Sequence, residues 1–189
     1  MPAPDPRARA ATPHDADELL RLRVAVLTGQ PVTDQWRATF RDDVRRRLGT
    51  DPDLFAYVAD APGGGLAACA IGIVYRGYCG PAYPTGRWAR IHTVVTDPAH
   101  RRQGLARAVT SALVAAITQH GCSIELRATE AGVPLYRSLG FKPVDGFMAL
   151  LPTSPGGRVV PAPPAFPSTT TESRCTRRAG CRSASSPTI

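Results

Sequence analysis

Two different spacings of hydrophobic residues divide the chain into helical and extended segments. Over residues 15–28 the apolar side chains recur at the period of an α-helix, at Leu19, Leu22 and Val26. Over residues 34–48 they stand at strict four-residue intervals, at Trp36, Phe40, Val44 and Leu48. The pattern therefore predicts two amphipathic helices, and a short strand over residues 8–12 precedes them.

Beyond residue 50 the spacing becomes that of β-strands. Residues 53–60 and 66–78 flank a Pro-Gly-Gly-Gly turn at 62–65, which predicts an antiparallel hairpin. A third strand is expected over residues 87–96. The same patterns predict, in order, a helix over 104–119, a strand over 123–129, a short helix over 134–140 and two last strands, one from 141 onward and one over 146–151.

Residues 152–189 differ in kind from the rest. They are rich in Pro, Ser and Thr and show little periodicity, so they cannot bury enough apolar surface to offset the entropy of ordering the chain. We expect one folded α/β domain over residues 1–151 and a disordered tail over residues 152–189.

Composition narrows the class of protein. The 189 residues are 43% hydrophobic, and the longest apolar run, residues 66–75, is too short to cross a membrane. The first residues show no apolar stretch typical of a secretory signal, which makes the cytoplasm the expected compartment. The five cysteines are irregularly spaced and odd in number, which argues against a disulfide framework and a metal site. Cys69 is expected to be a small buried hydrophobe.

The net charge of +8 suggests a polyanionic partner, but half of it lies in the tail. The last 38 residues carry five arginines and one glutamate. Nucleic-acid binding is not favoured, because no basic stripe interleaved with aromatic residues is visible. A polyanionic cofactor and a basic tail explain the charge better.

The segment His100-Arg101-Arg102-Gln103-Gly104-Leu105-Ala106 is the clearest chemical signal. It stands between a predicted strand and a predicted helix. The first N–H groups of a helix have no partner within the helix, and the helix dipole places partial positive charge there. A glycine allows close approach to the backbone, and arginines add charge. The segment therefore suits a phosphate or pyrophosphate.

The motif in this segment is R-x-x-G-x-A, formed by Arg101, Gly104 and Ala106. It matches neither the P-loop nor the G-x-G-x-x-G pattern. Together with the preceding strand and the later sequence LYRSLGF at 135–141, it resembles the GCN5-related N-acetyltransferase (GNAT) superfamily. The resemblance implies a mixed, splayed central sheet of six or seven strands, flanked by about four helices, with acetyl-CoA bound in the opening.

The resemblance also implies which residues bind acetyl-CoA. Backbone groups of Val94, Val95 and Thr96 would pair with the pantetheine arm as an added strand would. The pyrophosphate would lie on the amides of the loop. The cofactor-binding residues of the loop would be Arg101, Arg102, Gln103, Gly104, Leu105 and Ala106.

Two residues are candidates for proton transfer. The resemblance implies that Tyr136 faces the departing CoA sulfur as a general acid, although an interior tyrosine with a satisfied hydroxyl is the competing interpretation. Many relatives carry a glutamate base on the strand before the phosphate loop. Here His92 stands at about that place, and histidine titrates near neutral pH. Glu125 and Glu130 remain competing candidates for the base.

The sequence thus predicts direct transfer of an acetyl group from acetyl-CoA to the amine of a small molecule. Three alternatives stay open: a protein N-terminus or lysine as the acceptor, an acyl-CoA-binding regulatory domain without turnover, and a nucleic-acid-binding module acting through the tail. Acceptor recognition is expected from the first two helices, their link at 28–33 and the loop at 79–86. Many relatives form a homodimer, but nothing in the sequence marks an interface.

Overall fold

The computed structural model describes residues 5–27, 31–81 and 84–144. The chain divides into the units Met1–Pro143 and Val144–Ile189, and the elements below all belong to the first unit. In chain order they are β1 (Arg9–Ala10), α1 (Ala16–Val24), α2 (Asp34–Arg47), β2 (Leu54–Asp60), β3 (Leu66–Arg76), β4 (Arg87–Thr96), α3 (Leu105–Thr118), β5 (Ser123–Leu126) and α4 (Val133–Ser138).

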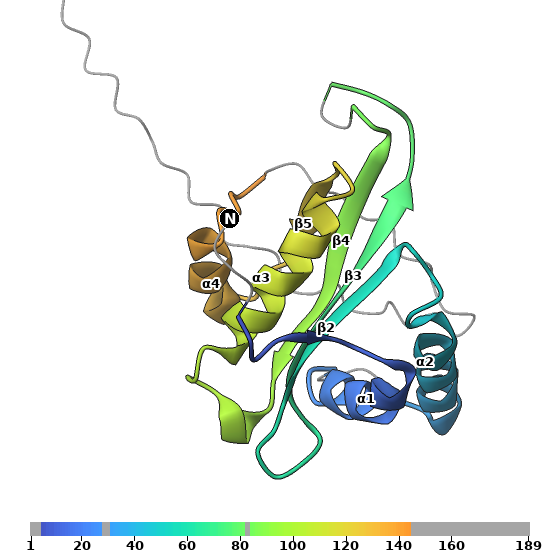
Figure 1. Ribbon diagram of the computed structural model, residues 1–189, viewed down its shortest axis with the longest axis vertical. Coiled ribbons are helices and arrows are strands. Elements are labelled where there is room, and N and C mark those ends of the chain that lie inside the picture. Colours follow the sequence, from blue (N-terminus) through green and yellow to red (C-terminus); the bar gives the residue numbers. More distant parts are fainter. Residues whose placement is uncertain (1–4, 28–30, 82–83, 145–189) are drawn as a thin grey trace, which may run out of the picture. The chain divides into compact units, whose positions relative to one another are not determined.

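The strands form one mixed sheet in the order β1-β2-β3-β4-β5. The first three pairings are antiparallel, and β4 pairs with β5 in parallel. The β2–β3 turn closes through Gly64 and Gly65, whose φ angles of 95° and 75° favour glycine. A parallel pair needs a crossover connection, and α3 supplies it between β4 and β5. As Figure 1 shows, α1 and α2 cover one face of the sheet and α3 covers the other, with α4 beside α3.

Alternating side chains of the central strands build two cores. On β2 and β3, residues such as Val58, Cys69 and Ile71 pack with Leu19 and Leu22 of α1. Their sequence neighbours face α3 on the opposite side of the sheet. Each core is therefore closed by one helical layer, which explains why the strands carry apolar residues on both faces.

The sheet opens between β4 and β5, which is the feature that matters most for function. Pairing runs only from Trp88 opposite Ser123 to Ile91 opposite Leu126. From His92 to Thr96, β4 keeps β3 on one side but has no strand on the other within the described part of the chain. Backbone groups along this second edge are thus left available to an extended ligand.

The predicted fold class is confirmed, but the predicted strand count of six or seven is too high for the residues described, which form five strands. Residues 141–144 are not a strand. The N–H of Phe141 donates to the carbonyl of Tyr136 at 3.0 Å, so it completes the end of α4 instead. The strand expected over 146–151 and the tail over 152–189 lie outside the described residues.

The first helix is shorter than its apolar pattern predicts. It ends at Val24, and Val26 is 43% exposed instead of buried. The amides of Val26 and Leu27 bond to carbonyls three residues back, at Arg23 and Val24, so the last turn tightens and carries Val26 away from the core.

Candidate functional site

The segment between β4 and α3 has the backbone of an anion-binding loop. At the start of the segment, the carboxylate of Asp97 accepts a hydrogen bond from the amide of Ala99 at 3.1 Å. The same carboxylate forms an ion pair with Arg21 of α1 at 2.6 Å. Farther along, Arg102 and Gly104 have φ angles of 63° and 80°. Such left-handed residues turn neighbouring N–H groups toward one side and form a concave nest for an anion.

The first turn of α3 leaves its backbone donors available. Gly104 is the N-cap residue and provides no side-chain cap. The amides that follow it therefore find no capping acceptor in the described part of the chain, and the positive end of the helix dipole adds to them. The side chains of Arg101 and Arg102 are exposed beside this turn. The arrangement suits a phosphate or pyrophosphate group.

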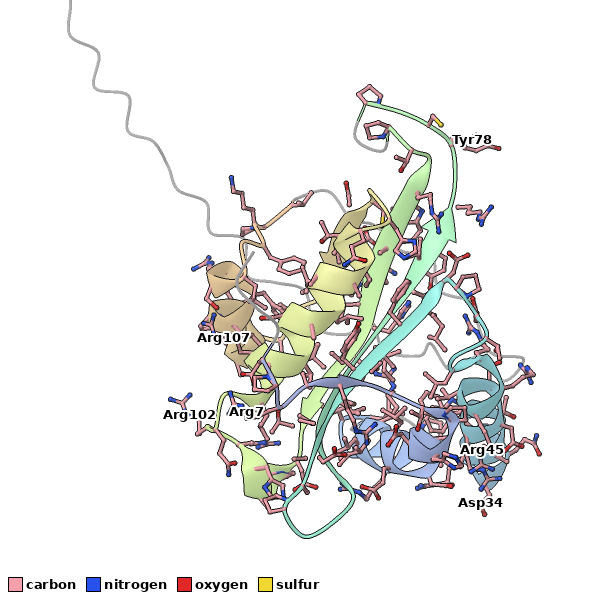
Figure 2. All side chains as sticks on the ribbon, in the orientation of Figure 1. Arg7, Asp34, Arg45, Tyr78, Arg102 and Arg107 are labelled. Carbon is pink, nitrogen blue, oxygen red and sulfur yellow. The ribbon has the colours of Figure 1, made fainter. Side chains whose placement is uncertain are left out.

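Arg7 also belongs to this loop, although sequence reasoning missed it. Its Nη1 donates to the carbonyl oxygen of Gln103 at 2.8 Å, and its Nη2 would lie 3.6 Å from a Cβ added at Gly104. The carboxylate of Asp5 pairs with the Arg7 guanidinium at 2.7 Å. The hydrogen bonds from Arg7 lower the pKa of Asp5 to about 2. Figure 2 labels both Arg7 and Arg102 near the start of α3. The 96 residues between Arg7 and Gln103 leave no local signal of this contact.

A bulge in β4 places His92 and Thr93 on the same face of the sheet. The register moves from Thr93 opposite Ile71 to Ile91 opposite Gly72, so His92 is the extra residue. Both side chains consequently line the same cavity on the side of α1 and α2. This cavity has a volume of about 190 Å³. Its walls are Arg23, Phe40, Asp43, Val44, Arg47, Leu54, Ile71, Ile73, His92 and Thr93.

His92 has the environment of a neutral proton acceptor. Partial burial, then the nearby charges of Arg90 and Arg23, lower the pKa of His92 below its usual 6.5, while Glu125 opposes them. Its Nε2 lies 2.7 Å from the hydroxyl of Tyr75, a residue that sequence reasoning did not single out. If the hydroxyl donates, Nε2 is the acceptor and Nδ1 carries the ring proton.

Tyr136 lies on α4, on the other side of the sheet from the cavity. Its ring meets Phe141 edge-on at 5.9 Å, and burial raises its pKa above 10. A Cβ at position 132 would come within 3.0 Å of the Tyr136 ring, so Gly132 makes room for it. No hydrogen bond to its hydroxyl occurs in the described part of the chain, which leaves a protonated phenol free to donate.

The other candidate residues are placed as follows. Val94, Val95 and Thr96 lie along the open edge of β4, and the buried Oγ1 of Thr96 has no hydrogen-bond partner among the described residues. His92 and Tyr136 share no contact there. Arg90 holds Glu125 at 2.6 Å, and Glu130 is exposed.

The described residues support three negative findings, on cysteine reactivity, metal binding and membrane spans. Cys69, Cys79 and Cys122 are free thiols, and burial raises the pKa of Cys69 to about 12, which makes it a poor nucleophile. Across residues 5–27, 31–81 and 84–144, no cluster of potential metal ligands is found. In the same ranges, every helix is too short or too polar to span a bilayer.

Solved structures of three acetyltransferases are similar to the chain. A GCN5-related N-acetyltransferase from Ralstonia eutropha is 26% identical, with a TM-score of 0.62, covering 76% of this chain and 97% of that chain. A predicted acetyltransferase from Clostridium acetobutylicum, solved with acetyl-CoA, is 22% identical, with a TM-score of 0.64 and coverage of 76% and 94%. Glucosamine-6-phosphate N-acetyltransferase from Arabidopsis thaliana is 18% identical, with a TM-score of 0.61 and coverage of 76% and 96%. No curated protein matches the sequence significantly.

The family comparison agrees with the geometry of the loop and the open sheet. The acetyltransferase (GNAT) family matches residues 19–141, which is well over half of the chain and includes every strand from β2 to β5. The chain therefore belongs to the acetyltransferase (GNAT) family and is an acetyl-transferring enzyme.

Proposed function

We propose that the enzyme transfers an acetyl group from acetyl-CoA directly to the amine of a small molecule. The observation that carries this proposal is the uncapped first turn of α3, which follows the open edge of β4 and has three arginines beside it. A diphosphate would fit the first turn of α3, and the peptide-like arm that follows it would fit the open edge of β4. The Clostridium acetobutylicum neighbour was solved with acetyl-CoA, and the Arabidopsis thaliana neighbour is named for an amino sugar phosphate.

In this mechanism the amine attacks the thioester carbonyl while His92 accepts its proton. The cavity lined by His92 opens on the face of α1 and α2, which would hold the acceptor. The tetrahedral intermediate collapses, the carbon–sulfur bond breaks and Tyr136 donates a proton to the CoA sulfur. The products are the acetylated amine and CoA thiol. Holding amine and thioester together supplies much of the rate.

The first test is calorimetric titration of acetyl-CoA into the full-length chain, followed by an assay of thiol release with a panel of small amines. Saturable binding and amine-dependent thiol release support the proposal. Binding without thiol release for any amine or peptide would indicate a regulatory acyl-CoA-binding domain. The absence of binding to a folded protein would contradict the proposal itself.

Replacing Tyr136 with Phe should lower kcat about 10- to 100-fold and leave the Kd of acetyl-CoA unchanged. The expected loss stands at the low end for general acids, because a thiol has a pKa near 8.5 and its thiolate leaves readily without much help. Steady-state kinetics and calorimetry on the same preparation measure both quantities. The Tyr57→Phe variant is a matched control on β2, and an equal loss there would argue against a role for the Tyr136 hydroxyl.

Replacing Arg7 with Ala should weaken acetyl-CoA binding about two- to fivefold, the range of one exposed charged contact. The variant removes the cation beside the loop and also the hydrogen bond to the Gln103 carbonyl. The effect should shrink as salt is added, since exposed charges are screened. Arg37→Ala serves as the control, because this partly exposed residue belongs to α2, which covers the face of the sheet opposite α3. Equal affinities of the two variants at low salt would refute a role for Arg7.

A further inference from the structure

Arg23 is a cation in the wall of the cavity that the proposed reaction assigns to the acceptor. Its Nη1 donates to Thr93 Oγ1 at 2.9 Å and to the carbonyl of His92 at 3.3 Å. These are the two residues of the β4 bulge. Its Nε and Nη2 make no hydrogen bond in the described part of the chain. The guanidinium is therefore fixed on one side and has donors left on the other.

Most other arginines of the described residues already have carboxylate partners. Ion pairs with Asp or Glu involve Arg7, Arg9, Arg21, Arg37, Arg41, Arg45, Arg46, Arg47, Arg76, Arg87 and Arg90. Arg101 and Arg102, at the loop proposed to bind diphosphate, make no such pair in the described part of the chain, and neither do the exposed Arg107 and Arg137. Arg23 makes none there either, although it is only partly exposed and lines a cavity. A charge in this setting lacks the partner that buried cations usually have.

The pKa of Arg23 and the pKa of its neighbour Arg21 shift in opposite directions. Carboxylates of Glu18 and Asp97 raise the pKa of Arg21, which precedes Arg23 by two residues on α1. For Arg23, burial is the main influence and it lowers the pKa, with no carboxylate opposing it. The enclosed guanidinium is thus destabilised in the free protein, and an anion beside it would relieve that cost.

The acid in the same cavity is not positioned to serve as this anion. Asp43 is bound by Arg47 at 3.2 Å and by Arg46, both on its own helix. Arg47 is bound in turn by Asp51 at 2.7 Å. Of the charged residues in the cavity wall, Asp43 and Arg47 are therefore already paired, and Arg23 is the arginine of that wall without a carboxylate among the described residues.

The geometry points to an acceptor that carries an anionic group, a carboxylate or a phosphate, held by Arg23 while its amine faces His92. This inference rests on the proposed acetyl transfer and adds the chemical class of the acceptor. A guanidinium binds either anion through paired N–H donors. The cavity of about 190 Å³ has room for a small anionic group and is open to solvent on one side. An amino acid or a phosphorylated amine has both required groups.

The binding of such an anion also connects recognition with catalysis. Arg23 contacts the backbone of His92, and its charge is one of those that keep the imidazole neutral. An anion on Arg23 offsets this charge when the acceptor is bound. His92 then becomes a stronger base in the complex than in the free enzyme.

The test compares pairs of amines that differ only in their charge. The carboxylate arm uses α-amino acids beside their carboxamides, and the phosphate arm uses phosphoethanolamine beside ethanolamine. We expect a lower KM for the anionic member, by about 10-fold or more, the value of one charge-assisted hydrogen-bond pair. In the Arg23→Gln variant this preference should disappear, while the KM of acetyl-CoA stays unchanged. Whichever arm shows the preference identifies the anion.

The control is Arg45→Gln, an exposed arginine of α2 that is paired with Asp17 and is labelled on the outer side in Figure 2. It should keep the preference for the anionic amine. Equal KM values within every pair would overturn the inference and leave acetyl transfer standing. An Arg23→Gln variant whose KM rises equally for both members of a pair would do the same. When no amine reacts, calorimetry with CoA present decides, and equal or absent binding of both members also overturns it. If acetyl-CoA itself fails to bind, the proposed function fails first, and this separate measurement distinguishes the two failures.

Discussion

The Gly104→Glu variant is expected to lose at least about 100-fold in its affinity for acetyl-CoA. Position 104 has a φ of 80°, where a side chain other than glycine costs about 1–2 kcal/mol. The new carboxylate would also stand at the positive end of α3, in the place proposed for the diphosphate. Two like charges about 4 Å apart repel by about 4 kcal/mol at an effective dielectric constant of about 20, which exceeds the roughly 3 kcal/mol of a 100-fold loss, whereas the strain is present with and without ligand. Calorimetry with the full-length chain measures it directly.

Loss of binding counts only if the variant stays folded, and the structure favours this. A Cβ at position 104 would meet only the Nη2 of Arg7, at 3.6 Å, at the end of a flexible side chain. The thermal transition of the variant should therefore fall by a few degrees at most. Gly104→Ala is the matched control, because it has the strain without the charge and should lose less than about tenfold. If Gly104→Glu binds acetyl-CoA as the native chain does, the loop is not the diphosphate site.

The spacing of apolar residues, together with the turn and cap residues, predicted most of the helices and strands. The range of β4 was predicted to the residue, and α2 and α3 differ from their predicted ranges by one residue at one or both ends. In these segments the apolar period, the flanking glycines and the caps agree, so few alternatives remain. The loop proposed to bind the diphosphate could be recognised for the same reason, since its glycine and its arginines lie close together in sequence.

The residues that the pattern did not reveal depend on contacts between distant segments. Arg7 meets Gln103 across the fold, and Tyr75 meets His92 only because β3 and β4 pair. The bulge at His92 could not be predicted either, because it depends on how β4 aligns with β3. Its effect is large, since one extra residue turns His92 and Thr93 to the same face.

Arg23 left a signal that was present but not used. It follows Leu19 by four residues, so it lies on the buried side of the first helix, where the pattern otherwise has apolar residues. A cation at such a position needs a partner, and the structure supplies only neutral ones. An arginine inside an apolar stripe is thus the sequence signal that corresponds to the proposed anion site.

The His92→Ala variant is expected to lower kcat about 100- to 10,000-fold, which is the usual contribution of a general base. In the native enzyme His92 must be neutral to accept a proton, so kcat at saturating amine should rise with pH and then level off. Burial and the charges of Arg90 and Arg23 lower the pKa of His92 in the free enzyme, whereas a bound anionic acceptor would raise it, so the rise in kcat reports the pKa of His92 in the complex. Acid inactivates the enzyme by protonating His92. In the His92→Ala variant, this rise should be absent.

Tyr75→Phe separates the role of the base from that of its orientation. It removes the hydroxyl 2.7 Å from Nε2 but keeps the stacking with Trp88, so kcat should fall less than in His92→Ala and the pH-dependent rise should persist. Retention of kcat within about threefold in His92→Ala would show that His92 is not the base, since even modest general bases contribute more. Glu125 would then be the next candidate, and Glu125→Gln should remove the pH dependence that His92→Ala leaves intact. The three profiles together assign the proton acceptor to one side chain.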